Sequence, residues 1–279
     1  MTTITDDEEL FRHAARSRGR VVLITGGAAG PARHAAWTFA KNGANVVIGD
    51  IFAPGAQDIV DTINRLPPGS GKAFWKRCDV TSWEDQVALF ECAMTRFGGV
   101  DIVIAGARVG ETQSFGTLEV SETDGKLLRP HLKTLSVNLT GAIYTTQLAL
   151  HYLPKTRNQT EPLKYVVLLG FLASWTAHPD QEIFVTSQHG LLGFARSVQP
   201  TLTLNGIRIA TVQSTCPPGH GDTDLTFRKT ANAMFFCATN PDPNANGSVW
   251  ALLQNGTIQR MEEAQERGSL GGPPAYTDL

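Results

Sequence analysis

The sequence predicts a single α/β domain built on a doubly wound, parallel β-sheet. Apolar runs such as 45–50, 165–169 and 207–213 alternate with longer segments whose apolar residues recur at helical spacing. Each run is continuous, which is typical of a strand buried on both faces in a parallel sheet. Right-handed crossovers between such strands place helices on both faces. The sequence shows no internal repeat and no second domain boundary.

The expected elements follow in a regular order after a short amphipathic helix over 5–17. Residues 20–43 are predicted as a strand, a glycine-rich turn and a helix that Gly43 closes. Ser82 is expected to cap a helix that runs to Phe97. The remaining strands are predicted at 45–50, 73–80, 101–107, 165–169, 207–213 and 247–254. The remaining helices are predicted at 53–65, 130–153, 182–204 and 223–238, with a long polar connection over 108–129.

Composition and charge narrow the functional classes. The formal net charge of -2 gives no electrostatic reason to expect nucleic acid or an anionic membrane as a partner. The start of the chain is acidic and carries no apolar run, and no apolar stretch is long enough to span a bilayer. No two cysteines have metal-ligand spacing, so we expect no metal site, reduced thiols and a cytoplasmic protein. We also expect an N-terminal helix within 1–18, one domain over 19–268 and a flexible tail over 269–279.

The glycine-rich turn over 25–32 is a candidate phosphate-binding site. Gly26 and Gly30 follow an apolar strand and precede a helix, so backbone amides and the helix N-terminus would face a pyrophosphate. Asp50 ends the second strand, where a carboxylate would accept a hydrogen bond from an adenosine ribose and disfavour a 2′-phosphate. Asp79 ends the third apolar run. The alternative for both aspartates is a turn residue at a strand end.

These motifs, together with residues 163–190 and the helical segment HGLLGFARS at 189–197, resemble the short-chain dehydrogenase/reductase family over roughly residues 19–216. The resemblance implies a Rossmann-like fold, and it places Cys78-Asp79-Val80 against adenine. It also implies a Ser at the end of the fifth strand and a Tyr-x-x-x-Lys on the following helix, which together transfer protons. The matching positions hold Phe171, Phe184 and Gln188. None of these side chains can give up or accept a proton at neutral pH.

The cofactor half also departs from the family pattern. The last glycine of T-G-x-x-x-G-x-G is Ala32, and Pro31 before it lacks an amide that could serve a phosphate. The family's Asn-Ala-Gly matches 106–108, which puts Arg108 where the pattern has glycine. After strand six, the family has an Asn followed by Pro-Gly. The matching positions here are Ala210 for the Asn and 214–215 for the Pro-Gly pair. We therefore interpret Gly26, Gly30, Asp50 and Asp79 as a vestigial cofactor site and expect no cofactor to be required, with NAD as the alternative.

Residues near the lost catalytic positions are candidates for a repurposed pocket. Asn138, in VNLTG, is the remaining match to the family's catalytic set, and its alternative role is to bond nearby backbone. Asp180, His178 and Arg108 join it as candidate catalytic groups. Asp180 could instead be the N-cap of the helix from Glu182, and His178 could simply be solvated. The expected pocket, floored by the two aromatic rings, is lined by Phe171, Trp175, Phe184, Gln188, His189, Glu111, Gln113 and Cys216.

Three functions remain open from the sequence. The first is a cofactor-independent, redox-neutral enzyme that isomerises, dehydrates or cyclises a small, mostly apolar metabolite, as in natural-product biosynthesis. The second is a non-catalytic pseudoenzyme that binds a ligand or an active dehydrogenase partner. The third is residual NAD-dependent oxidoreduction. The resemblance also implies a homo-oligomer, a dimer or tetramer, formed through the helices at 130–153 and 182–204.

Overall fold

A computed structural model describes residues 2–156, 163–175, 177–215, 224–253 and 255–261. Its described strands form one sheet in the order β1-β9-β8-β7-β6-β5-β2-β3-β4. The strands from β4 to β8 pair in parallel, and β9 and β1 add antiparallel pairs at one edge. The strands are β1 Thr3–Ile4, β2 Val21–Thr25, β3 Asn45–Asp50, β4 Ala73–Arg77, β5 Ile102–Ala105, β6 Tyr165–Phe171, β7 Arg208–Ser214, β8 Ser248–Leu252 and β9 Ile258–Met261.

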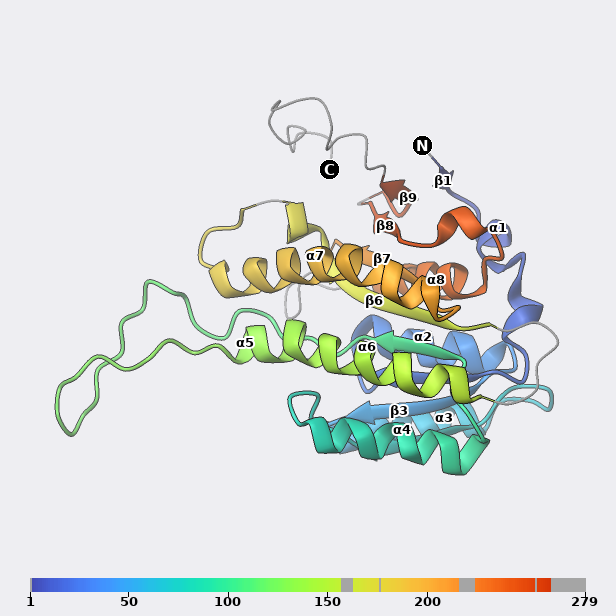
Figure 1. Cartoon of the computed structure of the whole chain (residues 1–279), viewed down its shortest axis with the longest axis horizontal. Coiled ribbons are helices and arrows are strands. Elements are labelled where there is room, and N and C mark those ends of the chain that lie inside the picture. Colours follow the sequence, from blue (N-terminus) through green and yellow to red (C-terminus); the bar gives the residue numbers. More distant parts are fainter. Residues whose placement is uncertain (1, 157–162, 176, 216–223, 254, 262–279) are drawn as a thin grey trace.

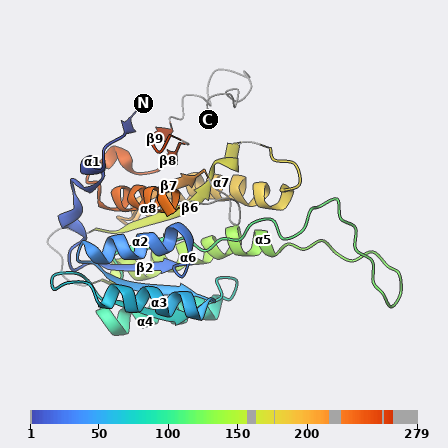
Figure 2. The ribbon, with the colours of Figure 1, turned by 180° about the vertical axis from the view of Figure 1, so that it is seen from behind.

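Helices cover both faces of this sheet, as the sequence predicts. Figure 1 shows α4, α6 and α7 on one face, and Figure 2, from behind, shows α2, α3 and α8 on the other. The helices are α1 Asp7–Phe11, α2 Gly30–Lys41, α3 Ala53–Asn64, α4 Trp83–Phe97, α5 Lys133–Leu135, α6 Gly141–Tyr152, α7 Glu182–Leu204 and α8 Asp224–Thr239. Short 3₁₀ turns lie at Ala14–Ser17, Leu153–Lys155, Leu172–Trp175 and Pro243–Ala245.

Alternate residues of the buried strands supply two separate cores. On β2, Val22 and Ile24 pack with the α2, α3 and α8 layer, whereas Leu23 packs with the α4, α6 and α7 layer. All three side chains are fully buried. Burial on both faces explains the continuous apolar runs and confirms the predicted doubly wound, single-domain architecture.

Most predicted elements are present, and the helix caps follow simple chemistry. Ser82 Oγ accepts a 3.1 Å bond from Asp85 N at the start of α4, as expected. Gly98, with φ of +78°, ends the same helix. The Ser82 side chain and the turn at Gly98 thus provide hydrogen bonds at the two ends of α4, where the helix leaves backbone N–H and C=O groups unpaired.

Three expectations about elements are wrong, and so is the alternative that made Asp180 a helix cap. The N-terminal helix ends at Phe11, and a 3₁₀ turn follows it. The residues before it form β1, whose Ile4 is buried in the same core as the sheet. The run at 247–254 is not the last strand, because β9 folds back against it. The helix predicted from 130 begins at Lys133, because the preceding residues belong to a projecting loop. Asp180 is not the N-cap of α7: Gln181 holds that position.

No helix among the described ranges combines the length and apolar character needed to cross a membrane. The tail expected over 269–279 lies outside the described residues.

Candidate functional site

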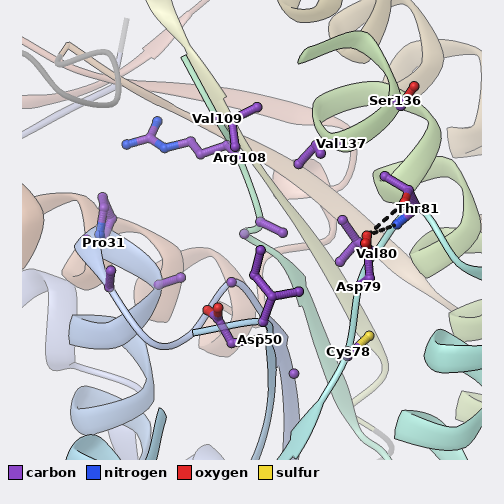
Figure 3. Close-up of a pocket in the computed structure, with 18 of the residues that line it drawn as sticks. Pro31, Asp50, Cys78, Asp79, Val80, Thr81, Arg108, Val109, Ser136 and Val137 are labelled. Atoms are coloured by element: carbon purple, nitrogen blue, oxygen red, sulfur yellow. Dashed lines mark hydrogen bonds between the residues drawn. The ribbon is translucent and has the colours of Figure 1, made fainter. Parts of the chain in front are cut away.

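A cavity of about 640 Å³ opens where the glycine-rich turn meets the carboxyl ends of β3, β4 and β5. This volume falls within the range of small-molecule sites. Its lining includes Gly26, Gly30, Asp50, Asp79 and Arg108, so the predicted cofactor residues and one predicted catalytic residue share one site (Figure 3). Lys133 and Phe227 complete other parts of the wall.

The glycine-rich turn has the conformation that its two matching glycines allow. Gly26 has φ of +74°, and a Cβ there would lie 2.5 Å from Cα of Ala107. Gly30 has φ of +57° at the start of α2, and a Cβ there would have Phe227 as its nearest neighbour, at 4.0 Å. A side chain would be strained at both positions, and glycine leaves the N-terminus of α2 open toward the cavity.

Asp50 organises this turn while facing the cavity. Its Oδ2 accepts a 2.9 Å bond from Ala28 N, and its Oδ1 accepts a 2.9 Å bond from Phe52 N. The side chain is half-buried and lines the cavity. A carboxylate has about four acceptor sites, so two remain for hydroxyl donors. The strand-end role and the ligand role, which the sequence presents as alternatives, are therefore compatible.

Asp79 and Cys78 form the adjacent wall. Asp79 Oδ1 accepts bonds from Thr81 N at 2.9 Å and from Thr81 Oγ1 at 2.7 Å (Figure 3). These bonds hold the pKa of Asp79 below its ordinary value. Burial, followed by repulsion from Asp85, Asp79 and Asp50, raises the pKa of the Cys78 thiol to about 12. The cavity therefore presents a carboxylate and a neutral thiol at neutral pH.

Gly106, directly after β5, lies close to both Ala32 and Thr25 of the glycine-rich turn. A Cβ on Gly106 would lie 2.8 Å from Cβ of Ala32 and 2.8 Å from the carbonyl oxygen of Thr25. The methyl group of Ala32 thus occupies space that a side chain at 106 would need. The pairing of a larger residue in the turn with glycine on the β5 loop preserves close packing at the floor of the cavity.

The loop after β5 is fixed by Asn138. The side-chain oxygen of Asn138 accepts a 2.8 Å bond from Val109 N, and its nitrogen donates a 2.8 Å bond to Val109 O. Asn138 lies in a π-helical turn over Ser136–Thr140, a feature common near functional sites. Because Val109 follows Arg108, this clamp orients the arginine, which points from the β5 loop toward the side of the cavity that holds Pro31 (Figure 3). Its Nη1 lies 3.5 Å from the carbonyl oxygen of Gly170.

The two aromatic residues at the proposed catalytic positions pack against each other. The ring centroids of Phe171 and Phe184 are 5.5 Å apart, and both side chains are buried. Neither residue lines the 640 Å³ cavity. The rings therefore form a small cluster where β6 ends and α7 begins, and the apolar pocket that the sequence predicts beside them stays a prediction.

Gln188 and Glu111 both make hydrogen bonds near the aromatic pair. Gln188 Nε2 donates a 3.1 Å bond to Ser187 Oγ, which also accepts a 3.2 Å bond from Asn138 Nδ2. Glu111 Oε2 accepts a 2.8 Å bond from Phe184 N, in the first turn of α7. The carboxylate thus caps a helix through a residue 73 positions further along the chain.

The other candidates are spread around the start of α7. Trp175 is half-buried, and the His178 ring lies 6.3 Å from that of Phe171. Asp180 is exposed, has φ of +62° and accepts a 3.4 Å contact from Ser114 Oγ. His189 is exposed and bonds Val185 O of its own helix at 3.0 Å, so it does not join the aromatic pair. Gln113 is half-buried, and Cys216 lies outside the described residues.

Sequence reasoning missed Ser187, Phe227, Ser174 and Gln213. Ser187 is the hub between Asn138 and Gln188, and Phe227 reaches the cavity from α8. In addition, three buried oxygens on this edge of the sheet lack a hydrogen-bond partner among the described residues. They are Glu111 Oε1, Ser174 Oγ and Gln213 Oε1. Buried polar atoms are normally paired, so these oxygens mark places for water or a polar ligand group.

Comparison of the sequence with known protein families covers most of the α/β core. A family model described as short chain dehydrogenase matches residues 20–233. The chain belongs to the short-chain dehydrogenase family. The fold also matches a crystal structure of a short chain dehydrogenase from Mycobacterium smegmatis, with a TM-score of 0.72 and 23% identity over 86% of this chain and 94% of that one.

Relatives within the short-chain dehydrogenase family include proteins of fungi and plants. The chain is 32% identical over 67% of its length to a short-chain dehydrogenase/reductase of Acremonium egyptiacum, covering 58% of that protein. It is 28% identical over 77% of its length to 11-beta-hydroxysteroid dehydrogenase A of Arachis hypogaea, covering 56% of that protein. The chain therefore spans under three fifths of the length of these relatives.

The residues present fit the adenosine half of the nicotinamide dinucleotides that this family normally uses. The fit rests on the open glycine-rich turn and on the acceptor sites that Asp50 keeps. Among the residues that the structure describes, no group of His, Cys, Asp and Glu could hold a metal ion.

Proposed function

We propose that this short-chain dehydrogenase binds NAD(H) through its adenosine half but does not use the proton relay of the family. The cavity between the glycine-rich turn and Asp50 carries the first part of this proposal. The second part rests on the alignment of Phe171, Phe184 and Gln188 with the Ser, Tyr and Lys positions. The proposal departs from the cofactor-free expectation, because the cavity favours the NAD alternative.

Four residues of the cavity have roles in this proposed binding. Asp50 accepts hydrogen bonds from ribose hydroxyls, and its charge repels a 2′-phosphate. Gly26 and Gly30 let the backbone approach a pyrophosphate, and the α2 N-terminus stabilises its charge. Arg108 adds a cation on the β5 side of the same cavity. When bound, the nicotinamide would supply a hydride donor or acceptor.

The proposed catalytic end lacks a group that could donate a proton to the substrate when the hydride is transferred. Phe184 is fully buried and has no ionisable group, and Gln188 uses its amide within the Ser187 network. Carbonyl reduction needs a proton on the oxygen as hydride arrives at the carbon. Any reaction at this end would then be redox-neutral.

A redox-neutral reaction of a small, mostly apolar molecule is the second candidate. The observation that favours it is the set of unpaired buried oxygens beside the aromatic pair, which suits a ligand with hydroxyl donors. The name of the hydroxysteroid dehydrogenase relative supports an alicyclic ligand of this kind. The binding of a ligand without turnover, as in a pseudoenzyme, would use the same groups.

Two assays on the purified protein test the main proposal. Isothermal titration calorimetry with NADH is expected to show binding, and NADPH is expected to bind more weakly. With bound NADH and a panel of alicyclic ketones, absorbance at the NADH band is expected to stay constant. Oxidation of NADH at ordinary dehydrogenase rates would overturn the second part of the proposal, and absence of binding would overturn the first.

A further inference from the structure

The loop between β5 and α5 forms an arm, defined here as residues 112–132. Figures 1 and 2 both show it projecting along the long axis of the molecule, well beyond the body of the domain. Val120 and Leu127 form an isolated antiparallel bridge across the arm. Backbone bonds from Ser121 N to Lys126 O and from Leu128 N to Glu119 O, both 2.8 Å, close a narrow two-stranded ribbon.

The arm carries much of the exposed apolar surface of the described chain. Eleven large hydrophobic side chains are exposed among the described residues, and six of them belong to the arm. The six are Phe115 (59%), Leu118 (74%), Val120 (59%), Leu127 (63%), Leu128 (47%) and Leu132 (46%). Clustered apolar side chains on a projecting segment are typical of an interaction surface.

The ribbon is not stabilised by a core of its own. An isolated two-stranded hairpin is marginally stable in water, because its few backbone bonds do not offset the loss of chain entropy. None of the six side chains belongs to either main core of the domain. A second surface that covers these side chains would supply the missing stabilisation.

The charges of the arm make it complementary to itself. The outgoing limb carries Glu119, Glu122 and Asp124, and the returning limb carries Lys126 and Arg129. Within one arm, the two limbs already attract each other: Lys126 Nζ lies 2.9 Å from Asp124 Oδ2, and His131 Nε2 lies 3.5 Å from Glu119 Oε2. A two-fold axis between two copies would place the acidic limb of each arm against the basic limb of the other.

We propose that the arm is a dimerisation element whose partner is the arm of a second copy of this chain. If each of the six side chains loses on the order of 100 Å² of exposed surface, two arms bury roughly 1,200 Å², the lower end of a standard interface. This interface differs from the two long helices through which the family resemblance implies assembly. The proposal does not depend on cofactor binding.

Residues at the two ends of the arm connect the proposed dimer interface to the region around Phe171 and Phe184. Ser114 Oγ contacts Asp180 Oδ1, and Thr134 Oγ1 donates a 2.9 Å bond to Gly110 O. Glu111, immediately before the arm, caps α7. Ordering of the arm by a second copy would therefore also order the residues that enclose the aromatic pair.

Analytical ultracentrifugation of the full chain at micromolar concentration tests the proposal. The protein is expected to sediment as a dimer or a multiple of it. The triple variant L118S/V120S/L127S is expected to sediment as a species of half that size. Phe52→Ser is the matched control, because Phe52 is 55% exposed just before α3 and lies outside both the arm and the two long helices through which the family resemblance implies assembly. It is expected to assemble like the natural protein. Circular dichroism of each variant checks that the fold is unchanged.

Cross-linking gives a second, direct readout. Val120→Cys is expected to form a disulfide-linked dimer under mild oxidation, whereas Phe52→Cys is not. A monomeric natural protein, or a triple variant with unchanged assembly, would overturn the proposal. Assembly only after addition of an active dehydrogenase would also overturn it and would instead favour a heteromeric partner.

Discussion

The carboxylate of Glu111 caps α7 through the amide of Phe184, at 2.8 Å, and so ties the β5 loop to the helix on which the family places its catalytic Tyr. Removal of Glu111 leaves this part-buried amide without an acceptor. We expect Glu111→Ala to lower the free energy of unfolding by about 1–2 kcal/mol. Glu111→Gln keeps an acceptor oxygen and is expected to lose less.

Urea denaturation of the two variants measures this difference. Glu91→Ala is a suitable control, because Glu91 is exposed on α4 and is expected to change stability by less than about 0.5 kcal/mol. Equal stabilities for Glu111→Ala and the natural protein would show that solvent replaces the cap.

Asp50 is expected to determine the choice of dinucleotide. Asp50→Asn keeps acceptor oxygen but removes the charge, so NADH binding should weaken by roughly 10- to 100-fold while NADPH binding weakens less. Calorimetric titration of both nucleotides measures the change. Asp58→Asn is the control, because Asp58 pairs with Arg33 on the α2–α3 surface and does not line the cavity. Unchanged NADH affinity in Asp50→Asn would remove Asp50 from the site.

The Thr81 hydroxyl is expected to make stability depend on pH through Asp79. Its bond contributes to a folded-state pKa of Asp79 below the unfolded value. The stabilisation is therefore fully present above the unfolded pKa and is lost as pH falls through the folded pKa. Thr81→Val should be less stable than the natural protein at neutral pH, and the difference should shrink in acid. Thr81→Ser should retain the stabilisation, and a pH-independent deficit in Thr81→Val, measured by urea denaturation across pH, would contradict this origin.

Cys78 should resist alkylation although it lines the cavity. Its thiol has a pKa of about 12, and only the thiolate is a good nucleophile. Cys237 is fully buried and its pKa is also raised, whereas Cys92 is partly exposed. Iodoacetamide at neutral pH should therefore label Cys92 before Cys78 and Cys237, as read by peptide mass spectrometry. Preferential labelling of Cys78 would indicate that the cavity wall opens in solution.

The parallel sheet was predictable because burial on two faces leaves a local signature. The run that became β6 is apolar throughout and the one that became β3 has an apolar centre over 46–48, so both strands are visible without their neighbours. β1 and β9 are short, and β9 carries polar residues. Pairing with β9 defines β1 as a strand, and pairing with β8 and β1 defines β9. That pairing has no local pattern in the sequence.

The site was predictable where a motif fixes the backbone. Gly26, Gly30 and Asp50 lie together as the spacing indicates. Local chemistry offered Asp180 as a possible cap of α7, but the acceptor comes from Glu111 on a different loop. Phe171 and Phe184 contact each other across the end of β6 and the start of α7, and the pocket predicted beside them stays a prediction. Both outcomes depend on tertiary packing rather than on local sequence.

The central claim is that the adenosine end of this site still binds while the proposed catalytic end lacks a proton donor. Calorimetric titration of the purified protein with NADH, beside NADPH, tests it most directly. We predict saturable NADH binding that is clearly tighter than NADPH binding. No detectable heat at millimolar NADH, or tighter binding of NADPH, would contradict the account.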